Sequence, residues 1–138
     1  MKIDEIKNGI VIDHIEAGKS MEIYNFLNLG NLDCSVAIIK NASSKKMGKK
    51  DIIKIDADIN LDMNVLGYID PGITINIIKN GEMLDKHHPA LPERLENVIE
   101  CKNPRCITSV ETDIPHIFKL TERETRVYRC VYCESKAE

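Results

Sequence analysis

Short apolar segments, separated by turn residues, recur along the N-terminal part of the chain. Many of their residues are β-branched, and apolar and polar side chains alternate within them, which is typical of strands with one buried face. Residues 41–49 are polar and basic and are expected to form a loop, and Asn80-Gly81 is a strong hairpin turn. The predicted strands cover residues 9–15, 34–40, 50–56, 73–79 and 82–85.

Two segments between these strands have the periodicity of helices. In residues 18–29 apolar side chains recur at helical spacing, and Gly30 provides a stop. Residues 61–68 suit a shorter helix, with Asp58 or Asn60 as its N-cap. The order is therefore β-α-β-β-α-β followed by a hairpin strand. This order predicts an α+β fold, a ferredoxin-like βαββαβ sandwich, with an antiparallel sheet, both helices on one face, and the first and third strands central.

The other face of this sheet is expected to be open to solvent, a ligand or a partner. The rows expected to pack under the helices are Ile53, Ile55, Ile73, Ile75 and Ile77. The residues expected on the open face are Lys54, Thr74 and Asn76 beside the apolar Ile52 and Ile78. Such a surface suits a flat heterocycle, because the ring contacts apolar side chains while a few polar groups fix its orientation.

Charged residues around this face are candidates for binding phosphates. Lys50, Lys54 and Lys86 are expected there, although each alone also fits an ordinary solvated lysine. Asp13 and His14 interrupt the first, central strand. Because neighbours on a strand point to opposite faces, both can serve one site only near the strand end. The alternative is a strand end with two solvated polar residues.

Four of the five cysteines lie in two close pairs near the C-terminus, Cys101 with Cys106 and Cys130 with Cys133. A Cys-x4-Cys and a Cys-x2-Cys loop direct four sulfurs at one tetrahedral centre, which is the layout of a zinc ribbon with one structural Zn²⁺ per chain. So short a region also needs a metal, disulfides or a partner in order to fold. Two disulfides are one alternative, and an iron–sulfur cluster, whose cysteines are usually more closely clustered, is another.

Composition argues against several classes of protein. The formal net charge is -3 and 4% of the residues are aromatic, whereas nucleic-acid-binding domains usually have a basic surplus. No apolar run approaches the roughly 20 residues that cross a bilayer. The start of the chain, Met1-Lys2-Ile3-Asp4, has no features of a signal peptide, so a cytoplasmic location in which thiols stay reduced is expected.

Three further features are interpreted as structural. Cys34 stands alone in an apolar segment, where a buried, unreactive thiol is expected. Adjacent histidines seldom converge on one ion, so we interpret His87 and His88 as linker residues. Residues 89–98 contain two prolines and no Gly/Ser run, which predicts an ordered junction between a domain at 1–92 and a domain at 93–138.

These features together resemble one family, the regulatory chain of aspartate carbamoyltransferase, the enzyme that opens pyrimidine synthesis. The matching segments are in family order, cover essentially the whole chain and are highly specific as a set. They are Gly-Ile-Val-Ile-Asp-His-Ile at 9–15, Met-Gly-Lys-Lys-Asp-Ile-Ile-Lys-Ile at 47–55, Thr-Ile-Asn-Ile-Ile at 74–78, Pro-Ala-Leu-Pro-Glu-Arg-Leu-Glu-Asn-Val at 89–98, and the two cysteine pairs.

The resemblance implies a non-catalytic, cytoplasmic regulatory chain. Its N-terminal domain would bind nucleotide effectors, CTP or UTP and ATP, and its zinc domain would dock onto the catalytic chain. Regulatory chains would pair as homodimers through their N-terminal domains and bridge catalytic trimers in a larger hetero-oligomer. Neither nucleic acid nor a membrane is expected as a partner.

The resemblance also implies the residues of the two sites. The triphosphate would contact Lys86 and His14, and the ribose hydroxyls would contact Asp13. Lys54 and the backbone near Ile6 would read the base edge, and Asn76 would bridge to sugar or phosphate. The complete effector set is Asp13, His14, Lys54, Asn76, Ile78 and Lys86, lined by Val11, Ile52 and Lys50 and approached by Ile3, Asp4 and Ile6. The zinc ligands would be Cys101, Cys106, Cys130 and Cys133.

Two other functions stay open on the residues alone. A zinc-ribbon nucleic-acid-binding module fits the cysteines and the sheet, but the acidic net charge and the lack of an aromatic stacking face stand against it. A zinc enzyme acting on nucleotides is disfavoured, because four thiolates leave no position for an activated water. The chain also lacks the His-x-Glu pair of nucleotide deaminases.

Overall fold

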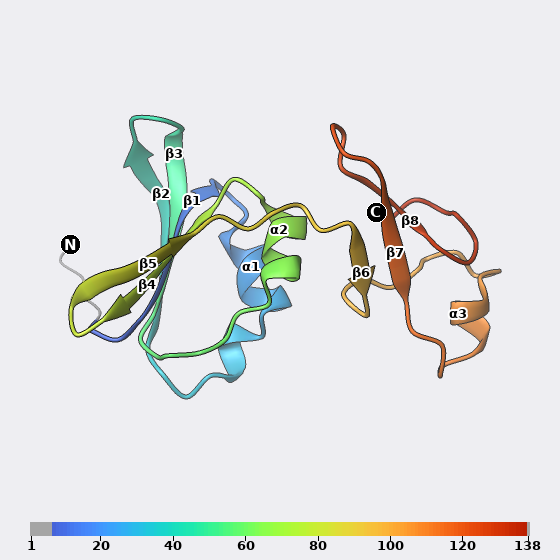
Figure 1. Ribbon diagram of the computed structural model, residues 1–138, viewed down its shortest axis with the longest axis horizontal. Helices are drawn as coiled ribbons and strands as arrows, with labels where there is room; N and C mark the ends of the chain where they lie inside the picture. The colour runs from blue at the N-terminus through green and yellow to red at the C-terminus, as the bar shows by residue number, and fades with distance from the viewer. Residues whose placement is uncertain (1–6, 138) are drawn as a thin grey trace. The chain divides into compact units, whose positions relative to one another are not determined.

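An antiparallel sheet of five strands and a second sheet of three strands organise the fold. The computed structural model describes residues 7–137, and the chain divides between Ala90 and Leu91 into two compact units, here called the sheet unit and the cysteine unit. The elements of the sheet unit are β1 (Gly9–Glu16), α1 (Ser20–Phe26), the 3-10 helix η1 (Leu29–Asn31), β2 (Val36–Ser44), β3 (Gly48–Ile55), α2 (Met63–Ile69), β4 (Thr74–Lys79) and β5 (Glu82–His87) (Figure 1). Those of the cysteine unit are β6 (Arg94–Glu96), α3 (Ile107–Val110), β7 (Ile117–Glu122) and β8 (Val127–Cys130).

The strands of the sheet unit follow the order β2-β3-β1-β4-β5, and each neighbouring pair is antiparallel. Figure 1 shows α1 and α2 together on one face of this sheet. β1 and β3 each have a strand on both sides. The predicted α+β, ferredoxin-like fold is therefore confirmed. The face opposite the helices is called the open face below.

Isoleucine side chains at alternate strand positions form the core between the sheet and the helices. The predicted rows are buried, except that Ile77 is partly exposed. Each fully buried side chain of this size contributes about 1.5–3 kcal/mol to folding. The helices add Ile23, Val65, Leu66 and Ile69 to the same core.

Residues 41–49 form a hairpin, and the expectation of a loop was wrong. β2 continues to Ser44, and β3 already begins at Gly48. The turn between them is tight: the Met47 N–H donates to Ser44 Oγ over 3.1 Å, and Gly48 has φ +79°. Most side chains of this hairpin are exposed, so its strands are as polar as a loop and lack a buried row that would reveal them.

The first helix is shorter than expected. α1 ends at Phe26, and Asn28 adopts a left-handed backbone conformation with φ 53°, after which the chain forms η1. Asn tolerates this conformation better than most residues, because its short polar side chain can bond locally. No helix within residues 7–137 is long and apolar enough to cross a membrane.

The second helix begins later than expected, because its cap is a different residue. Asp62, not Asp58 or Asn60, is the N-cap of α2. Its Oδ1 accepts hydrogen bonds from the N–H groups of Asn64 (3.0 Å) and Val65 (3.3 Å). All three residues are reasonable caps by type, and the position at which the chain turns onto the sheet decides between them.

Asp51 of β3 is a charged residue with 0% of its surface exposed. It accepts hydrogen bonds from the N–H of Gly18 (3.1 Å), from the N–H (3.4 Å) and hydroxyl (2.6 Å) of Ser20, and from the N–H of Asn41 (3.0 Å). Burial by itself would raise the pKa of Asp51, but these hydrogen bonds outweigh it and hold the pKa below the ordinary value of an aspartate. The carboxylate therefore ties the β1–α1 turn and the middle of β2 to β3.

The cysteine unit has a small core on the sheet β6-β7-β8. Leu95, Phe118 and Tyr128 are buried, and the Tyr128 hydroxyl donates to the carbonyl of Pro92. Strand β6 comes from the segment that the sequence predicted as a junction. Residues 94–96 of that segment are thus held by pairing with β7.

Replacing Asp51 with Asn is expected to destabilise the sheet unit, because one or more buried N–H donors lose their acceptor at about 1–3 kcal/mol each. The pKa of Asp51 is lowered by folding, so its carboxylate stabilises the fold above the unfolded-state pKa, and this contribution is lost as the pH falls through the folded-state pKa. The wild type should therefore unfold at lower urea concentrations as the pH drops below about 4. Asp51→Asn should show a shallower acid dependence, and equal slopes would contradict this account.

Candidate functional site

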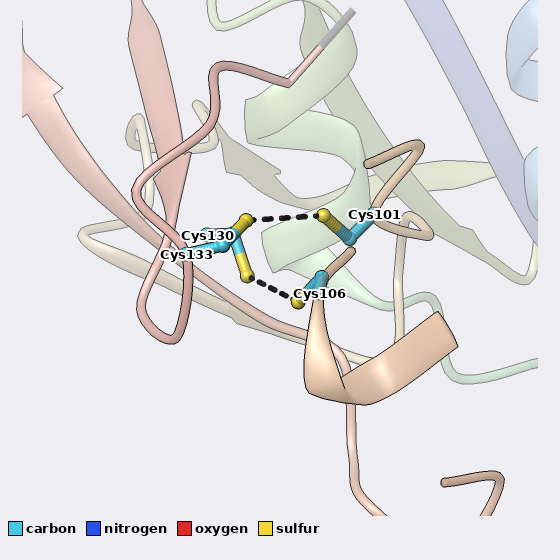
Figure 2. A group of neighbouring side chains, drawn as sticks. All are labelled: Cys101, Cys106, Cys130 and Cys133. Carbon is cyan, nitrogen blue, oxygen red and sulfur yellow. Dashed lines mark hydrogen bonds between the residues drawn. The ribbon is translucent and has the colours of Figure 1, made fainter. Parts of the chain in front are cut away.

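The four paired cysteines converge on one point in the cysteine unit (Figure 2). Their Sγ atoms all lie within 4.8 Å of one another. The Sγ atoms of Cys101 and Cys133 are 3.6 Å apart, and those of Cys106 and Cys130 are 3.7 Å apart. A tetrahedral site with metal–sulfur bonds of about 2.3 Å has sulfurs about 3.8 Å apart. All four cysteines are free, so the disulfide alternative does not describe this structure.

Local backbone turns hold each pair of cysteines in position. The Cys106 N–H donates to the Asn103 carbonyl over 3.1 Å, and the Glu134 N–H donates to the Cys130 carbonyl over 2.8 Å. The Thr108 hydroxyl donates to Cys106 Sγ over 3.1 Å. Such donors stabilise the negative charge of a thiolate and orient it toward a cation.

The surroundings give the sulfurs different acidities. Burial, together with hydrogen bonds to the neighbouring thiols, raises the pKa of Cys101 to about 12, and burial also raises the pKa of Cys130. Hydrogen bonds from Ser135, its hydroxyl first, lower the pKa of Cys133 to about 6. A bound divalent cation would stabilise all four thiolates together. Four sulfur donors suit a soft ion, and they fill a tetrahedral coordination sphere without a position for a reacting water.

Cys34, His87 and His88 do not belong to this cluster. Cys34 is partly exposed, which corrects the expectation of a buried thiol, because β2 begins only at Val36 and the preceding residues lie outside the core. His87 Nε2 lies 3.0 Å from Asp85 Oδ2, and His88 is exposed. In the described part of the chain, no group of potential metal ligands includes either histidine.

A row of side chains crosses four strands on the open face. Val11 of β1 lies opposite Lys54 of β3 and opposite Asn76 of β4, and Asn76 lies opposite Lys86 of β5. Residues directly opposite in an antiparallel pair point to the same face. The Asn76 Nδ2 donates to the Val11 carbonyl over 3.5 Å. Across residues 7–137, no ion pair joins Lys54 or Lys86 to a carboxylate, so both ammonium groups are available to an anion.

An extra residue in β1 brings Asp13 and His14 to this face together. The pairing of β1 with β3 shifts between Ile12 and Ile15, and His14 has the left-handed φ of 59°. His14 Nδ1 lies 3.1 Å from Thr74 Oγ1, and Thr74 lies opposite Asp13. A β-bulge interrupts the strict alternation of faces. Asp13 and His14 therefore come to one face through a bulge near the end of β1, which the alternation of strand faces does not predict.

Thr74 is buried and contacts His14, a role in the candidate site that the sequence does not indicate. Strand alternation puts it on the open face, but its partner His14 becomes visible only when the bulge is known. The bulge depends on how β1 pairs with strands that lie far away in the sequence, so no local pattern reveals it.

Asp13 forms an ion pair with Lys50 at the edge of this surface. Lys50 Nζ lies 3.0 Å from Asp13 Oδ1 and 3.3 Å from Oδ2, and the His14 N–H donates to Oδ1 over 2.6 Å. Burial by itself would raise the pKa of Asp13, but Lys50 and the His14 N–H outweigh it and lower the pKa. Asp13 is thus ionised at neutral pH and can only accept hydrogen bonds.

The apolar part of the open face is formed by Val11, Ile52 and Ile78, which are all partly exposed. Ile52 lies between Lys50 and Lys54 on one side of β3, and Ile78 follows Asn76 on the same side of β4. The nine candidate residues between Val11 and Lys86 thus belong to one face of adjacent strands or to its bulge. Ile3, Asp4 and Ile6 lie outside the described residues.

Comparisons with known proteins agree with both units. Residues 1–90 match the family model "Aspartate carbamoyltransferase regulatory chain, allosteric domain", and residues 93–138 match "Aspartate carbamoyltransferase regulatory chain, metal binding domain". The chain is 53% identical over 135 residues to the aspartate carbamoyltransferase regulatory chain of Clostridium tetani, which covers 97% of this chain and 94% of the relative. The regulatory chain of Bifidobacterium longum is 41% identical over 138 residues, covering 100% and 99% of the two chains.

These matches agree with the architecture and the cluster of four cysteines. Both family models describe parts of a regulatory chain, and the relatives are named as regulatory chains over nearly their full length. The protein is therefore a non-catalytic regulatory subunit with an allosteric domain and a metal-binding domain. The chain belongs to the aspartate carbamoyltransferase regulatory chain family.

Proposed function

We propose that this chain transmits the binding of nucleotides to the catalytic chain of aspartate carbamoyltransferase, in the cytoplasm. The domain at residues 1–92 binds CTP or UTP and ATP on its open face. The domain at residues 93–138 holds one structural Zn²⁺ and contacts the catalytic chain. The observation that carries this proposal is the row with two available ammonium groups, Lys54 and Lys86, beside the bulge that presents Asp13 and His14.

Each part of a nucleotide has a chemical partner on the open face. Lys86 and His14 bind the triphosphate, because both donate hydrogen bonds and the ammonium group carries charge. Asp13, an acceptor, binds the ribose hydroxyls, and Asn76 bridges to sugar or phosphate. Lys54 reads the edge of the base.

The remaining candidates shape the pocket for the base. Val11, Ile52 and Ile78 give an apolar surface for a flat ring, and the pair of Lys50 with Asp13 holds the carboxylate in place. Ile3, Asp4 and Ile6 complete the proposed set of effector residues. A nucleotide regulates the enzyme only if it binds two states of the assembly with different affinity.

The zinc ion keeps a docking surface in shape. Four exposed apolar side chains flank the cysteines: Ile107 and Val110 on α3, and Val131 and Tyr132 between Cys130 and Cys133. Val110 is 69% exposed. Exposed apolar side chains that gather on one surface favour a protein partner, and we propose that these four do so. Regulatory chains also pair as homodimers through their N-terminal domains. These pairs bridge catalytic trimers, which yields the larger hetero-oligomer.

Replacing Lys54 or Lys86 with Ala is expected to weaken CTP binding about tenfold or more, because a hydrogen bond to a charged group contributes about 1.5–3 kcal/mol. Calorimetric titration of the full chain with CTP measures this. Lys79→Ala is the matched control, because Lys79 ends β4 on the alternate side from Asn76 and pairs weakly with Asp58 at 3.8 Å. The control should bind CTP like the wild type. Wild-type affinity in all three variants would disprove the proposed site.

Chelation of zinc is expected to unfold the cysteine unit and to leave the sheet unit folded, because such sites contribute about 10–16 kcal/mol to folding. Metal analysis of the purified chain should find one zinc, and Cys106→Ser should lose it. Cys34→Ser is the matched control and should keep it. NMR signals of Phe118 and Tyr128 report the fold of the cysteine unit, and signals that stay dispersed after complete zinc removal would refute the structural role.

Placing a charge on the docking surface is expected to reduce co-purification with the catalytic chain. Val110→Lys introduces the charge at a site exposed enough that the fold can tolerate it. Leu84→Lys is the control, since Leu84 is 65% exposed on β5 of the sheet unit. Pull-down with the tagged catalytic chain should weaken for the first variant only. Equal recovery of both variants and the wild type would count against this surface.

A further inference from the structure

We propose that Asp70 is a positioning residue for the nucleotide site, which holds the hydrogen-bonded pair of His14 and Thr74 in place. This inference rests on the proposed function. Asp70 is buried at the C-terminal end of α2 and belongs to none of the open-face strands. It therefore acts through other residues and does not contact the nucleotide.

One carboxylate connects the two chain segments that carry the pair. Asp70 Oδ2 accepts a hydrogen bond from the Glu16 N–H over 3.0 Å, and Oδ1 accepts one from the Gly72 N–H over 3.0 Å. Glu16 follows His14 by two residues, and Gly72 precedes Thr74 by two. A single side chain thus joins the segments that carry the two members of the pair.

The bond to Glu16 continues the connection between β1 and β4 beyond the end of their backbone pairing. The last residues in register are Asp13 and Thr74. Beyond them the bulge turns the backbone of β1 away from the regular ladder. The Asp70 carboxylate accepts the Glu16 N–H at this point, so the strand end stays attached.

The bulge requires such support, because His14 has φ 59°, a conformation that residues other than glycine rarely adopt. A conformation of this kind persists only where the surroundings determine it. On the β3 side, Ile15 pairs with Asp51, whose carboxylate binds the N–H of Gly18. Asp70 is the corresponding support on the β4 side.

Asp70 is itself firmly held. Its N–H donates to the Leu66 carbonyl over 2.9 Å, the last bond of α2, and its own carbonyl accepts from the Ile73 N–H over 3.4 Å. Lys19, from the turn after β1, donates from Nζ to the Ile69 carbonyl over 3.3 Å. The C-terminal end of α2 is therefore bonded both to the end of β1 and the turn after it, and to the turn before β4.

A preorganised His14 binds a phosphate without first losing the freedom to move. If Asp70 is removed, the His14 side chain has to be ordered when the nucleotide binds, and affinity falls. Asp70→Ala removes both acceptor oxygens. Asp70→Asn retains one oxygen, so its effect should be intermediate.

Asp62→Ala is a matched control at the other end of the same helix. The Asp62 carboxylate also accepts hydrogen bonds from two backbone N–H groups, those of Asn64 and Val65, but both belong to α2 itself. Its loss destabilises the helix without touching β1 or β4. The two alanine variants thus separate loss of stability from loss of positioning.

The experiment measures CTP affinity of the full chain and, without nucleotide, the imidazole ¹⁵N and ¹H NMR signals of His14. We expect Asp70→Ala to weaken CTP binding about tenfold, the equivalent of one charge-assisted hydrogen bond. We also expect the His14 signals of this variant to move toward those of the exposed His88. In Asp62→Ala the affinity should stay within about twofold of the wild type, and the His14 signals should not move.

Two outcomes would overturn the inference. One is an Asp70→Ala chain whose His14 signals match the wild type, and the other is an equal loss of CTP affinity in Asp70→Ala and Asp62→Ala. Failure of the wild type to bind CTP would instead refute the proposed function. The NMR comparison needs no nucleotide, so it tests the positioning role in that case too.

Discussion

The carboxylate of Asp51 is buried where three segments of the sheet unit meet, and a buried charge is tolerated only when hydrogen bonds compensate for its lost hydration. Gly18, Ser20 and Asn41 supply these bonds, so the β1–α1 turn, the middle of β2 and strand β3 have to be in place together. The neighbouring positions of β3 on the open face are Lys50 and Ile52. One face of β3 thus packs in the core, and its other face carries candidate ligand contacts.

This constraint also explains why β3 has a bulged strand on each side. The pairing of β1 shifts near His14 and that of β2 shifts near Asn41, and both residues have φ 59°. Asp51 holds the bulge in β2 directly, because it accepts a hydrogen bond from the Asn41 N–H. It also stabilises the turn that follows the bulge in β1, through the Gly18 N–H. The bulge in β1 then serves the open face, because it lets Asp13 and His14 lie beside Thr74.

The two units obtain their stability in different ways. The sheet unit has rows of buried isoleucines between a sheet and two helices, whereas the cysteine unit has a small core and four sulfurs that converge on one point. A metal at that point can supply the folding energy that a small core lacks. A sheet with a buried isoleucine core and a small core around four converging sulfurs therefore obtain their order by different means within one chain.

Features that depend on local spacing could be predicted from the sequence. The alternation of Ile53 and Ile55 with Lys54 predicted the two faces of the sheet, and the spacing of the cysteines predicted their convergence. Three features became visible only in the folded chain: the position of the bulge in β1, the capping of α2 by Asp62, and the connection of β1 and β4 by Asp70. The physical reason is that a side-chain pattern reports which face of an element is buried, whereas a bulge, a cap and a buried carboxylate depend on donors and strands that lie far away in the chain.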